Sequence, residues 1–188
     1  MSNSVPVRFA DPASRPARPR AFKTILCGGV LVGVLDALDA MIFSGLRGVS
    51  PGRVWQFVAS GLLGRASFSG GMKTVSLGLL LHFLIAFVLS AIYYGASLSF
   101  PVLLRQAVMC GLIYGAAVYF VMNYVVLPLS AAPPLPFSVA SFLNGIIGHA
   151  LLVGLPIALI ARWSRRSASP GAPASGYDKT APAVSNTL

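Results

Sequence analysis

Four long apolar runs divide the chain, and polar stretches separate them. The runs cover residues 21–46, 74–97, 101–127 and 137–163. Because about 20 apolar residues, each rising 1.5 Å along a helix, span the hydrocarbon core of a bilayer, each run predicts a membrane-spanning helix. The pattern therefore predicts an all-α fold, a four-helix transmembrane bundle.

A shorter apolar segment lies within residues 47–73, which are otherwise rich in glycine, serine and basic side chains. Ser50 followed by Pro51 is typical of a helix start with proline at the first helical position. The apolar positions that follow alternate with polar ones and are too few to cross a bilayer. We expect a short amphipathic helix over about 51–64, lying in the membrane interface with Trp55 as its anchor. A re-entrant segment is the alternative.

The two ends of the chain are polar. Residues 1–20 are rich in Pro, Ser and Arg, and residues 166–188 in Ser, Ala, Pro and Gly. Such compositions cannot bury enough apolar surface to fold, so we expect disordered tails, the first of them basic. They flank one membrane domain over residues 21–165. The first apolar run shows no convincing cleavage site, and we interpret it as a retained helix rather than a signal peptide.

Composition supports a lipid environment. Hydrophobic residues make up 56% of the chain and charged residues 10%, and the mean hydropathy is +0.79. Soluble domains carry about 25% charged residues. The net charge of +10 at first suggests nucleic acid, but no charged residue lies between Lys73 and Arg105 or between Arg105 and Arg162. The bases gather at the ends of apolar runs, so we expect the lipid bilayer as partner and no nucleic acid.

The distribution of bases predicts the orientation. Four spans place both termini on one side of the membrane. Four of the 14 Lys and Arg residues lie in the loop 47–73, and the other ten lie on the side of the termini. This bias predicts cytoplasmic termini. The four loop bases are candidates for contact with anionic lipid headgroups, with guidance of an anionic solute as the alternative: Arg47, Arg53, Arg65 and Lys73.

Small residues recur at helical spacing. Gly29 and Gly33 form one small-xxx-small pair, and Gly111 and Gly115 form another. Such pairs let neighbouring helices approach closely, within one chain or between copies in a homo-oligomer. The short connection between the second and third runs predicts that these two helices are antiparallel neighbours, and Pro156 predicts a kink in the last helix.

Two of the four acidic residues, Asp36 and Asp39, lie inside the first apolar run. Carboxylates at such depth are costly, so they indicate a functional site. The up-and-down order of the spans places a set of polar side chains in the outer half of the membrane, where we expect one polar layer. Its members are Asp36, Asp39, His82, Asn123, Asn144 and His149.

Several chemistries suit this layer. It could bind an ion or relay protons. Asp36, Asp39, His82 and His149 could instead ligate a divalent metal, with the asparagines outside them. The two histidines could also hold a haem. In the plainest interpretation, the polar groups bond to one another and only fix the helix register. Because Asn144 and His149 lie about 140° apart around their helix, at most one of them can point straight at the first helix.

No enzyme motif of the GxSxG, HExxH, Walker A or GxGxxG type occurs, and no catalytic residue is assigned. Three functions stay open. The first is a small transport or ion-relay protein that uses the Asp/His layer. The second is a non-catalytic membrane partner or assembly protein, and the third is a haem or quinone electron-transfer subunit. Cofactors and further partners stay unassigned.

The chain also resembles a known group of proteins in the pattern of its apolar runs. The runs GGVLVGVLDALDAMIF, PGRVWQFVASGLLG, LGLLLHFLIAF, YGAAVYFVMNYVVLPLS and NGIIGHALLVGLPIAL are similar to those of small bacterial inner-membrane proteins with domains of unknown function, in the style of the YagU-like group. The resemblance covers roughly residues 24–163. It implies a multi-pass protein of the bacterial inner (cytoplasmic) membrane and transfers no site residue.

Overall fold

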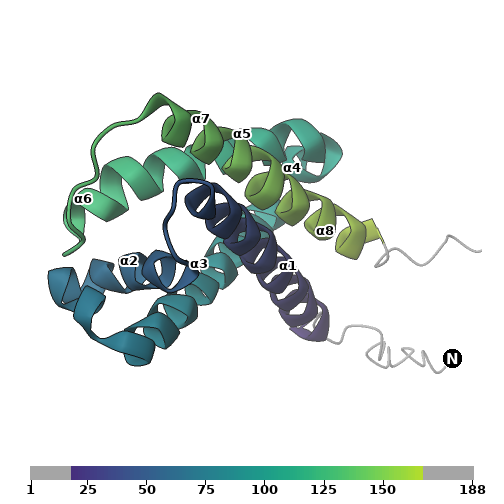
Figure 1. The fold of residues 1–188 in the computed structure, drawn as a ribbon. Coiled ribbons are helices and arrows are strands. Elements are labelled where there is room, and N and C mark those ends of the chain that lie inside the picture. Colours follow the sequence, from purple (N-terminus) through teal and green to yellow (C-terminus); the bar gives the residue numbers. More distant parts are fainter. Residues whose placement is uncertain (1–17, 167–188) are drawn as a thin grey trace, which may run out of the picture.

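The computed structural model describes residues 18–166, which form helices and no strand (Figure 1). The expectations for the two tails therefore lie outside the described residues. The α-helices are α1 (Arg18–Gly45), α2 (Pro51–Leu63), α3 (Gly71–Ser99), α4 (Val102–Arg105), α5 (Ala107–Val121), α6 (Leu127–Leu129), α7 (Val139–Gly148) and α8 (Leu155–Arg166). The tighter or wider turns are the 3₁₀ segment η2 (Gly64–Ser69) and the π-helical segments η3 (Met122–Val126) and η4 (His149–Gly154).

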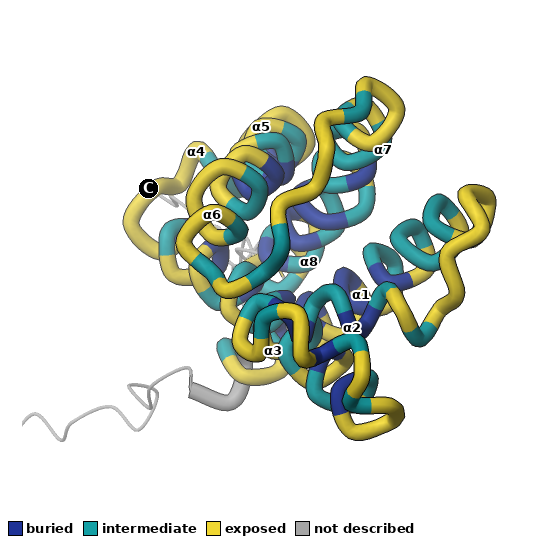
Figure 2. The backbone as a smooth tube through the Cα atoms, turned by 60° about the vertical axis from the view of Figure 1, so that its left-hand side comes forward, coloured by how far each residue is buried: buried dark blue, intermediate teal, exposed yellow. Residues whose placement is uncertain are grey.

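Four helical stretches are long and apolar enough to cross a membrane. They cover Ala21–Gly45, Gly71–Ser99, Ala107–Leu129 and Val139–Arg166. The predicted four-helix bundle with a shorter helix between the first two spans is confirmed. Much of the surface of these helices is apolar and exposed, as lipid-facing helices require (Figure 2).

The third span departs from the predicted helix over 101–127. The chain forms the short helix α4, breaks at Gln106, and begins the long helix at Ala107. Pro128 lies inside α6, which ends at Leu129 and directly follows the π-helical segment η3.

The helices pack in an order that differs from their order along the chain. α1 lies between α3 and the α7–η4–α8 span, and α5 packs against η4 and α8 (Figure 1). The second and third spans are not neighbours along their length, so that prediction was wrong. They meet near their connection, where Tyr93 donates to the carbonyl of Leu103 and Tyr114 to that of Leu89. Beyond that contact, α1 and the last span fill the centre of the bundle.

Both glycine pairs mark close helix contacts, as predicted. A Cβ at Gly115 would collide with the backbone of His149, and one at Gly111 would approach the carbonyl of Gly154. A Cβ at Gly33 would meet the ring of Phe83 on α3. The glycine faces are therefore filled from within the chain, and a homo-oligomer would need another surface.

The predicted short helix exists as α2 and lies alongside α3 (Figure 1). Its buried face contains Trp55, Gln56, Ala59 and Ser60. Gly78 of α3 admits this approach, because a Cβ there would collide with the carbonyl of Trp55. One face of α2, which includes the predicted anchor Trp55, thus belongs to the protein core.

Candidate ion-binding site

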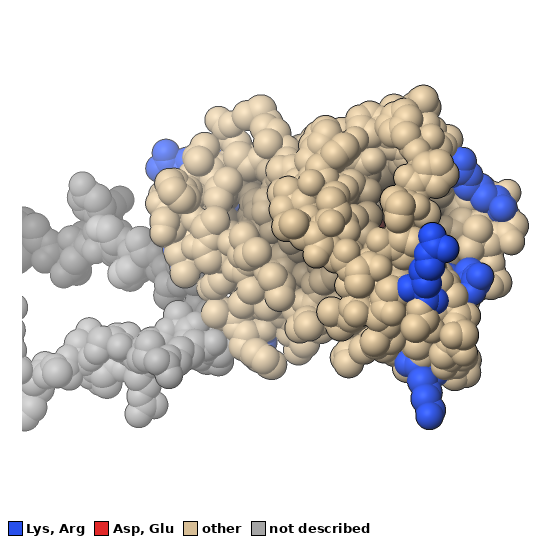
Figure 3. Space-filling model, turned by 90° about the vertical axis from the view of Figure 1, so that its left-hand side faces the viewer, with Lys and Arg blue, Asp and Glu red and all other residues tan. Residues whose placement is uncertain are grey.

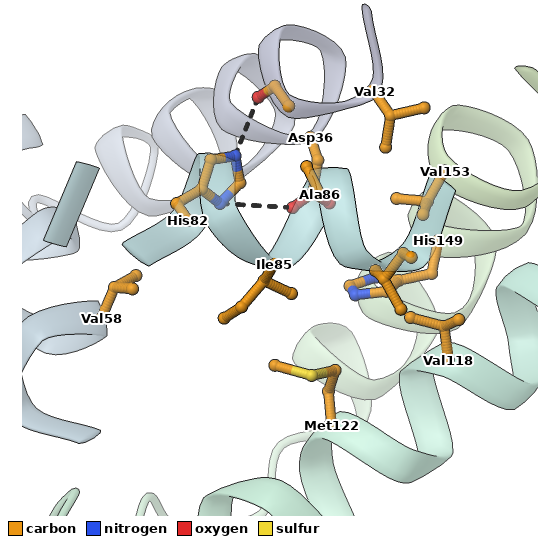
Figure 4. Close-up of a pocket in the computed structure, with 12 residues that line it drawn as sticks. Val32, Asp36, Val58, His82, Ile85, Ala86, Val118, Met122, His149 and Val153 are labelled. Carbon is orange, nitrogen blue, oxygen red and sulfur yellow. Dashed lines mark hydrogen bonds and ion pairs between the residues drawn. The ribbon is translucent and has the colours of Figure 1, made fainter. Parts of the chain in front are cut away.

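A cavity of about 180 Å³ lies between α1, α3, α5 and η4 (Figure 4). We name it the polar cavity, because its lining contains three ionisable side chains: Asp36, His82 and His149. The other lining residues are apolar or small: Val32, Gly33, Val58, Ile85, Ala86, Leu89, Val118, Met122 and Val153. The structure thus brings one acid and both histidines of the predicted layer together.

His82 of α3 is held in place by the backbone of α1. Its Nε2 lies 2.8 Å from the carbonyl oxygen of Gly33. A carbonyl only accepts, so Nε2 carries the proton and donates. The ring also meets Trp55 of α2 and Phe83 edge-on, with centroids 5.3 and 5.5 Å away. These contacts fix the orientation of the imidazole, and Figure 4 shows the interactions of its two nitrogens.

The second nitrogen of His82 faces a carboxylate. Nδ1 lies 3.9 Å from Oδ2 of Asp36, a distance suited to an ion pair but too long for a hydrogen bond. When His82 is neutral with its proton on Nε2, the lone pair at Nδ1 faces the oxygen lone pairs of an unprotonated Asp36 carboxyl group and repels them. One added proton, on either group, turns this repulsion into attraction. The pair therefore has the chemistry of a binding site for a single proton.

His149 occupies another wall of the polar cavity. Its Nδ1 lies 2.9 Å from the carbonyl of Gly145, one helical turn earlier, so Nδ1 carries the proton and donates. Its ring meets Tyr119 edge-on, with centroids 5.6 Å apart. This tautomer leaves Nε2 as an acceptor when the ring is neutral. The two histidines are thus oriented by backbone carbonyls on different helices.

Asp39 does not line the polar cavity. Its Oδ2 accepts a hydrogen bond of 2.9 Å from Nδ2 of Asn144 on α7. Gly148, one turn beyond Asn144, makes room for it, because a Cβ at Gly148 would lie 3.0 Å from that oxygen. Asp39 is therefore a partner in an interhelical contact. Asp39 and Asn144 of the predicted layer therefore form a contact of their own, apart from the polar cavity.

Asn123 also lies apart from the polar cavity. Its side chain donates to the carbonyl of Tyr119 on its own helix, at 2.9 Å. It lines a separate hollow beside the proline-rich loop, with Phe57, Pro128 and Leu135 among its neighbours. The side-chain amide of Asn123 thus bonds within its own helix and does not contribute to the polar cavity.

The candidate metal ligands do not assemble. Among residues 18–166, no three His, Cys, Asp or Glu side chains come together as a metal site. His82 has Nε2 bonded to the carbonyl of Gly33 and Nδ1 facing Asp36 at 3.9 Å.

The four loop bases lie at the opposite end of the molecule from the described termini, and all are exposed (Figure 3). Arg47 donates to the hydroxyls of Ser141 at 2.6 Å and Ser138 at 3.1 Å. The guanidinium of Arg53 donates to the carbonyl of Phe68 and lies over its ring. Two of the predicted headgroup contacts therefore also hold the loops of the protein together.

The sequence interpretation missed the two π-helical segments. Met122, His149 and Val153 belong to η3 and η4, and all three line the polar cavity. A proline follows each segment, Pro128 and Pro156, and proline cannot donate a backbone hydrogen bond. Where a kink at Pro156 was predicted, the structure has the wider π-helical turn η4 just before the proline. Since π turns are frequent at functional sites, these prolines were a usable signal for the location of the cavity.

No protein-family model, no curated protein and no solved structure matches the chain.

Proposed function

We propose that this chain is a small transport or ion-relay protein whose proton-binding site is the pair of Asp36 and His82. We place it in the bacterial inner membrane, as the resemblance implies, with both termini in the cytoplasm, as the distribution of bases predicts. The observation that carries the proposal is the orientation of His82. Its donated proton goes to Gly33, and its other nitrogen faces Asp36 at 3.9 Å.

The surroundings of the pair support proton binding. Asp36, His82 and His149 are the ionisable groups among the residues that line the polar cavity, and no Lys or Arg lies among those lining residues. The carboxylate of Asp36 therefore lacks a permanent cationic partner in this lining. An intramembrane carboxylate without such a partner is typical of proton and ion pathways. His149 provides a second proton acceptor on another wall of the cavity.

A proton-flux assay tests this proposal. The full-length protein is reconstituted in liposomes that contain a pH-sensitive dye, and a potassium diffusion potential drives proton entry. Asp36→Asn and His82→Gln each remove one titrating group and should lower the flux at least tenfold. Asp39→Asn is the matched control, because it removes the neighbouring carboxylate and keeps an oxygen that accepts from Asn144; it should leave the flux unchanged. Equal flux in wild type, Asp36→Asn and protein-free liposomes would refute the proposal.

A second candidate is the membrane partner or assembly protein. The hydrogen bond between Asp39 and Asn144 favours it, because this contact joins two helices and serves no cavity. On this alternative the Asp36 variants would change the stability of the bundle and leave proton flux at the background level. The same liposome experiment, together with the unfolding measurements described below, distinguishes the two candidates.

A further inference from the structure

The polar cavity lies beside a second, apolar space. This apolar groove has a volume of about 320 Å³ and lies between α2, α3 and the end of the third span. Its lining residues are Phe57, Val58, Gly61, Leu62, Leu81, Ile85, Met122, Val126, Leu127 and Ser130. Val58, Ile85 and Met122 line both spaces. The two spaces are therefore adjacent, and these three side chains stand between a molecule in the groove and the cavity.

The groove is accessible from the side of the molecule. Leu62 and Val126 line it and are 64% and 40% exposed. At one end, the amide of Ala131 donates to the carbonyl of Gly61 and joins α2 to the loop after α6. Because the exposed surface of these spans is apolar, as a lipid-facing surface is, the groove opens on the side where the bilayer would lie. Its volume lies within the range of about 300–1,000 Å³ that is typical of small-molecule sites.

The polar groups of the cavity determine which polar group of a ligand can bind there. With both histidines neutral, each donates its single proton to a backbone carbonyl, Gly33 or Gly145. What then faces the cavity is the carboxylate of Asp36 and the lone pairs of the imidazoles. A site of acceptors with one negative charge suits a protonated amine. A carboxylate, a phosphate or a quinone carbonyl would meet acceptors without donors.

We propose that the site binds a lipophilic ammonium compound from the bilayer, with its apolar part in the groove and its protonated amine on Asp36. This inference rests on the proposed function and names its substrate class. The amine and the proton are alternative partners of the same carboxylate, so binding of the cation releases the proton from the pair. The exchange conserves charge, since one cation replaces another. Entry of the amine and exit of the proton are then coupled at Asp36.

The test uses full-length protein in lipid nanodiscs and two probes of equal apolar part, 4-phenylbutylammonium and 5-phenylpentanoate. The ammonium probe should bind saturably, above its partition into empty nanodiscs, and should release protons to an indicator dye. The carboxylate probe should neither bind nor compete. Asp36→Asn should weaken binding of the ammonium probe at least tenfold, and Asp39→Asn should leave it unchanged. Equal binding of both probes would overturn the proposal.

Two substitutions test the groove itself. Leu81→Trp fills the groove without touching the polar cavity, and Leu80→Trp places the same ring on the neighbouring, 66% exposed position of α3. Leu81→Trp should weaken binding at least tenfold, and Leu80→Trp should not change it. Leu62→Trp, on the exposed wall from α2, fills the same groove and should also weaken binding even if Leu81→Trp fails to fold. Unchanged binding in a folded groove variant would overturn the proposal.

The proposed function and the substrate class can be refuted independently. Proton flux without any amine tests the Asp36–His82 pair, and ammonium binding tests the substrate class. Asp36-dependent flux without saturable ammonium binding would refute the substrate class and leave the proton site intact. Absence of Asp36-dependent flux would refute the proposed function itself.

Discussion

Asp36 and Asp39 lie three residues apart on one helix and have different surroundings. Asp36 faces α3 across the polar cavity, with His82 at 3.9 Å. Asp39 faces α7 and accepts a direct hydrogen bond of 2.9 Å from Asn144. At 100° per residue, positions three apart differ by about 60° around the helix. Because α1 lies between two other spans, that rotation is enough to give the two carboxylates different neighbours.

The comparison shows how one helix can hold a structural and a functional acid. The carboxylate of Asp39 has a permanent donor, since an amide keeps its N–H at every pH. The partner of Asp36 is an imidazole, whose second nitrogen donates only when it is protonated. The first contact is therefore constant and the second depends on a proton. Substitutions around each acid test whether the Asp39 contact is structural and the Asp36 contact proton-dependent, with unfolding by SDS in mixed micelles as the measurement.

The largest effect is expected when the permanent donor beside Asp39 is replaced by an acid. Asn144→Asp places two carboxylates in contact, and the Coulomb repulsion of two charges 4 Å apart is about 1–4 kcal/mol for effective dielectric constants between 80 and 20. The free energy of unfolding should fall by about that amount at neutral pH and recover as the pH is lowered and one carboxylate protonates. The double exchange Asp39→Asn with Asn144→Asp re-creates a donor–acceptor pair in reverse. Failure of this exchange to restore stability would show that Asp39 and Asn144 are not coupled.

A smaller effect should separate the two pairs directly. Double-mutant cycles to alanine measure the coupling energy of Asp39 with Asn144 and of Asp36 with His82. Interhelical hydrogen bonds in membranes average about 0.6 kcal/mol and reach about 1.7 kcal/mol, so the first cycle should fall in that range. The second should be smaller, because no direct hydrogen bond joins the pair. A larger coupling for Asp36 with His82 would reverse the assignment of the structural and functional acids.

Much of the architecture was predictable because the membrane imposes strong rules. The length and apolarity of the four runs predicted the spans, and the spacing of Gly111 and Gly115 predicted a close helix contact. What the sequence could not supply was the order of the helices in space. A short connection suggested that the second and third spans pack together, but Tyr93 and Tyr114 join them only near that connection. Packing partners depend on long-range shape, which local patterns do not encode.

Depth along each span predicted one polar layer of six residues, and Asp36, His82 and His149 of that layer line the polar cavity. The other three, Asp39, Asn123 and Asn144, do not line it. Depth alone could not show that Asn123 bonds within its own helix or that Asn144 selects Asp39. Those outcomes depend on the rotation of each helix about its axis. The π turns at Met122 and His149 change that rotation in a way that a regular 3.6-residue period does not predict.

The smallest expected effect concerns the glycine that makes room for Asp39. Gly148 lies at the end of α7, where replacing glycine by alanine should gain about 0.5–1 kcal/mol from reduced backbone entropy. In the native chain, the new Cβ would lie 3.0 Å from Oδ2 of Asp39, so Gly148→Ala presses on the carboxylate and loses most of that gain. In an Asp39→Ala background the carboxylate is absent, and the full gain should appear in the free energy of unfolding. Equal effects of Gly148→Ala in both backgrounds would mean that the space beside Gly148 is not reserved for Asp39. A smaller gain in the native chain than in the Asp39→Ala background would show that the space beside Gly148 on α7 is occupied by the carboxylate of Asp39. Asp36 is then the carboxylate that is available for ion binding.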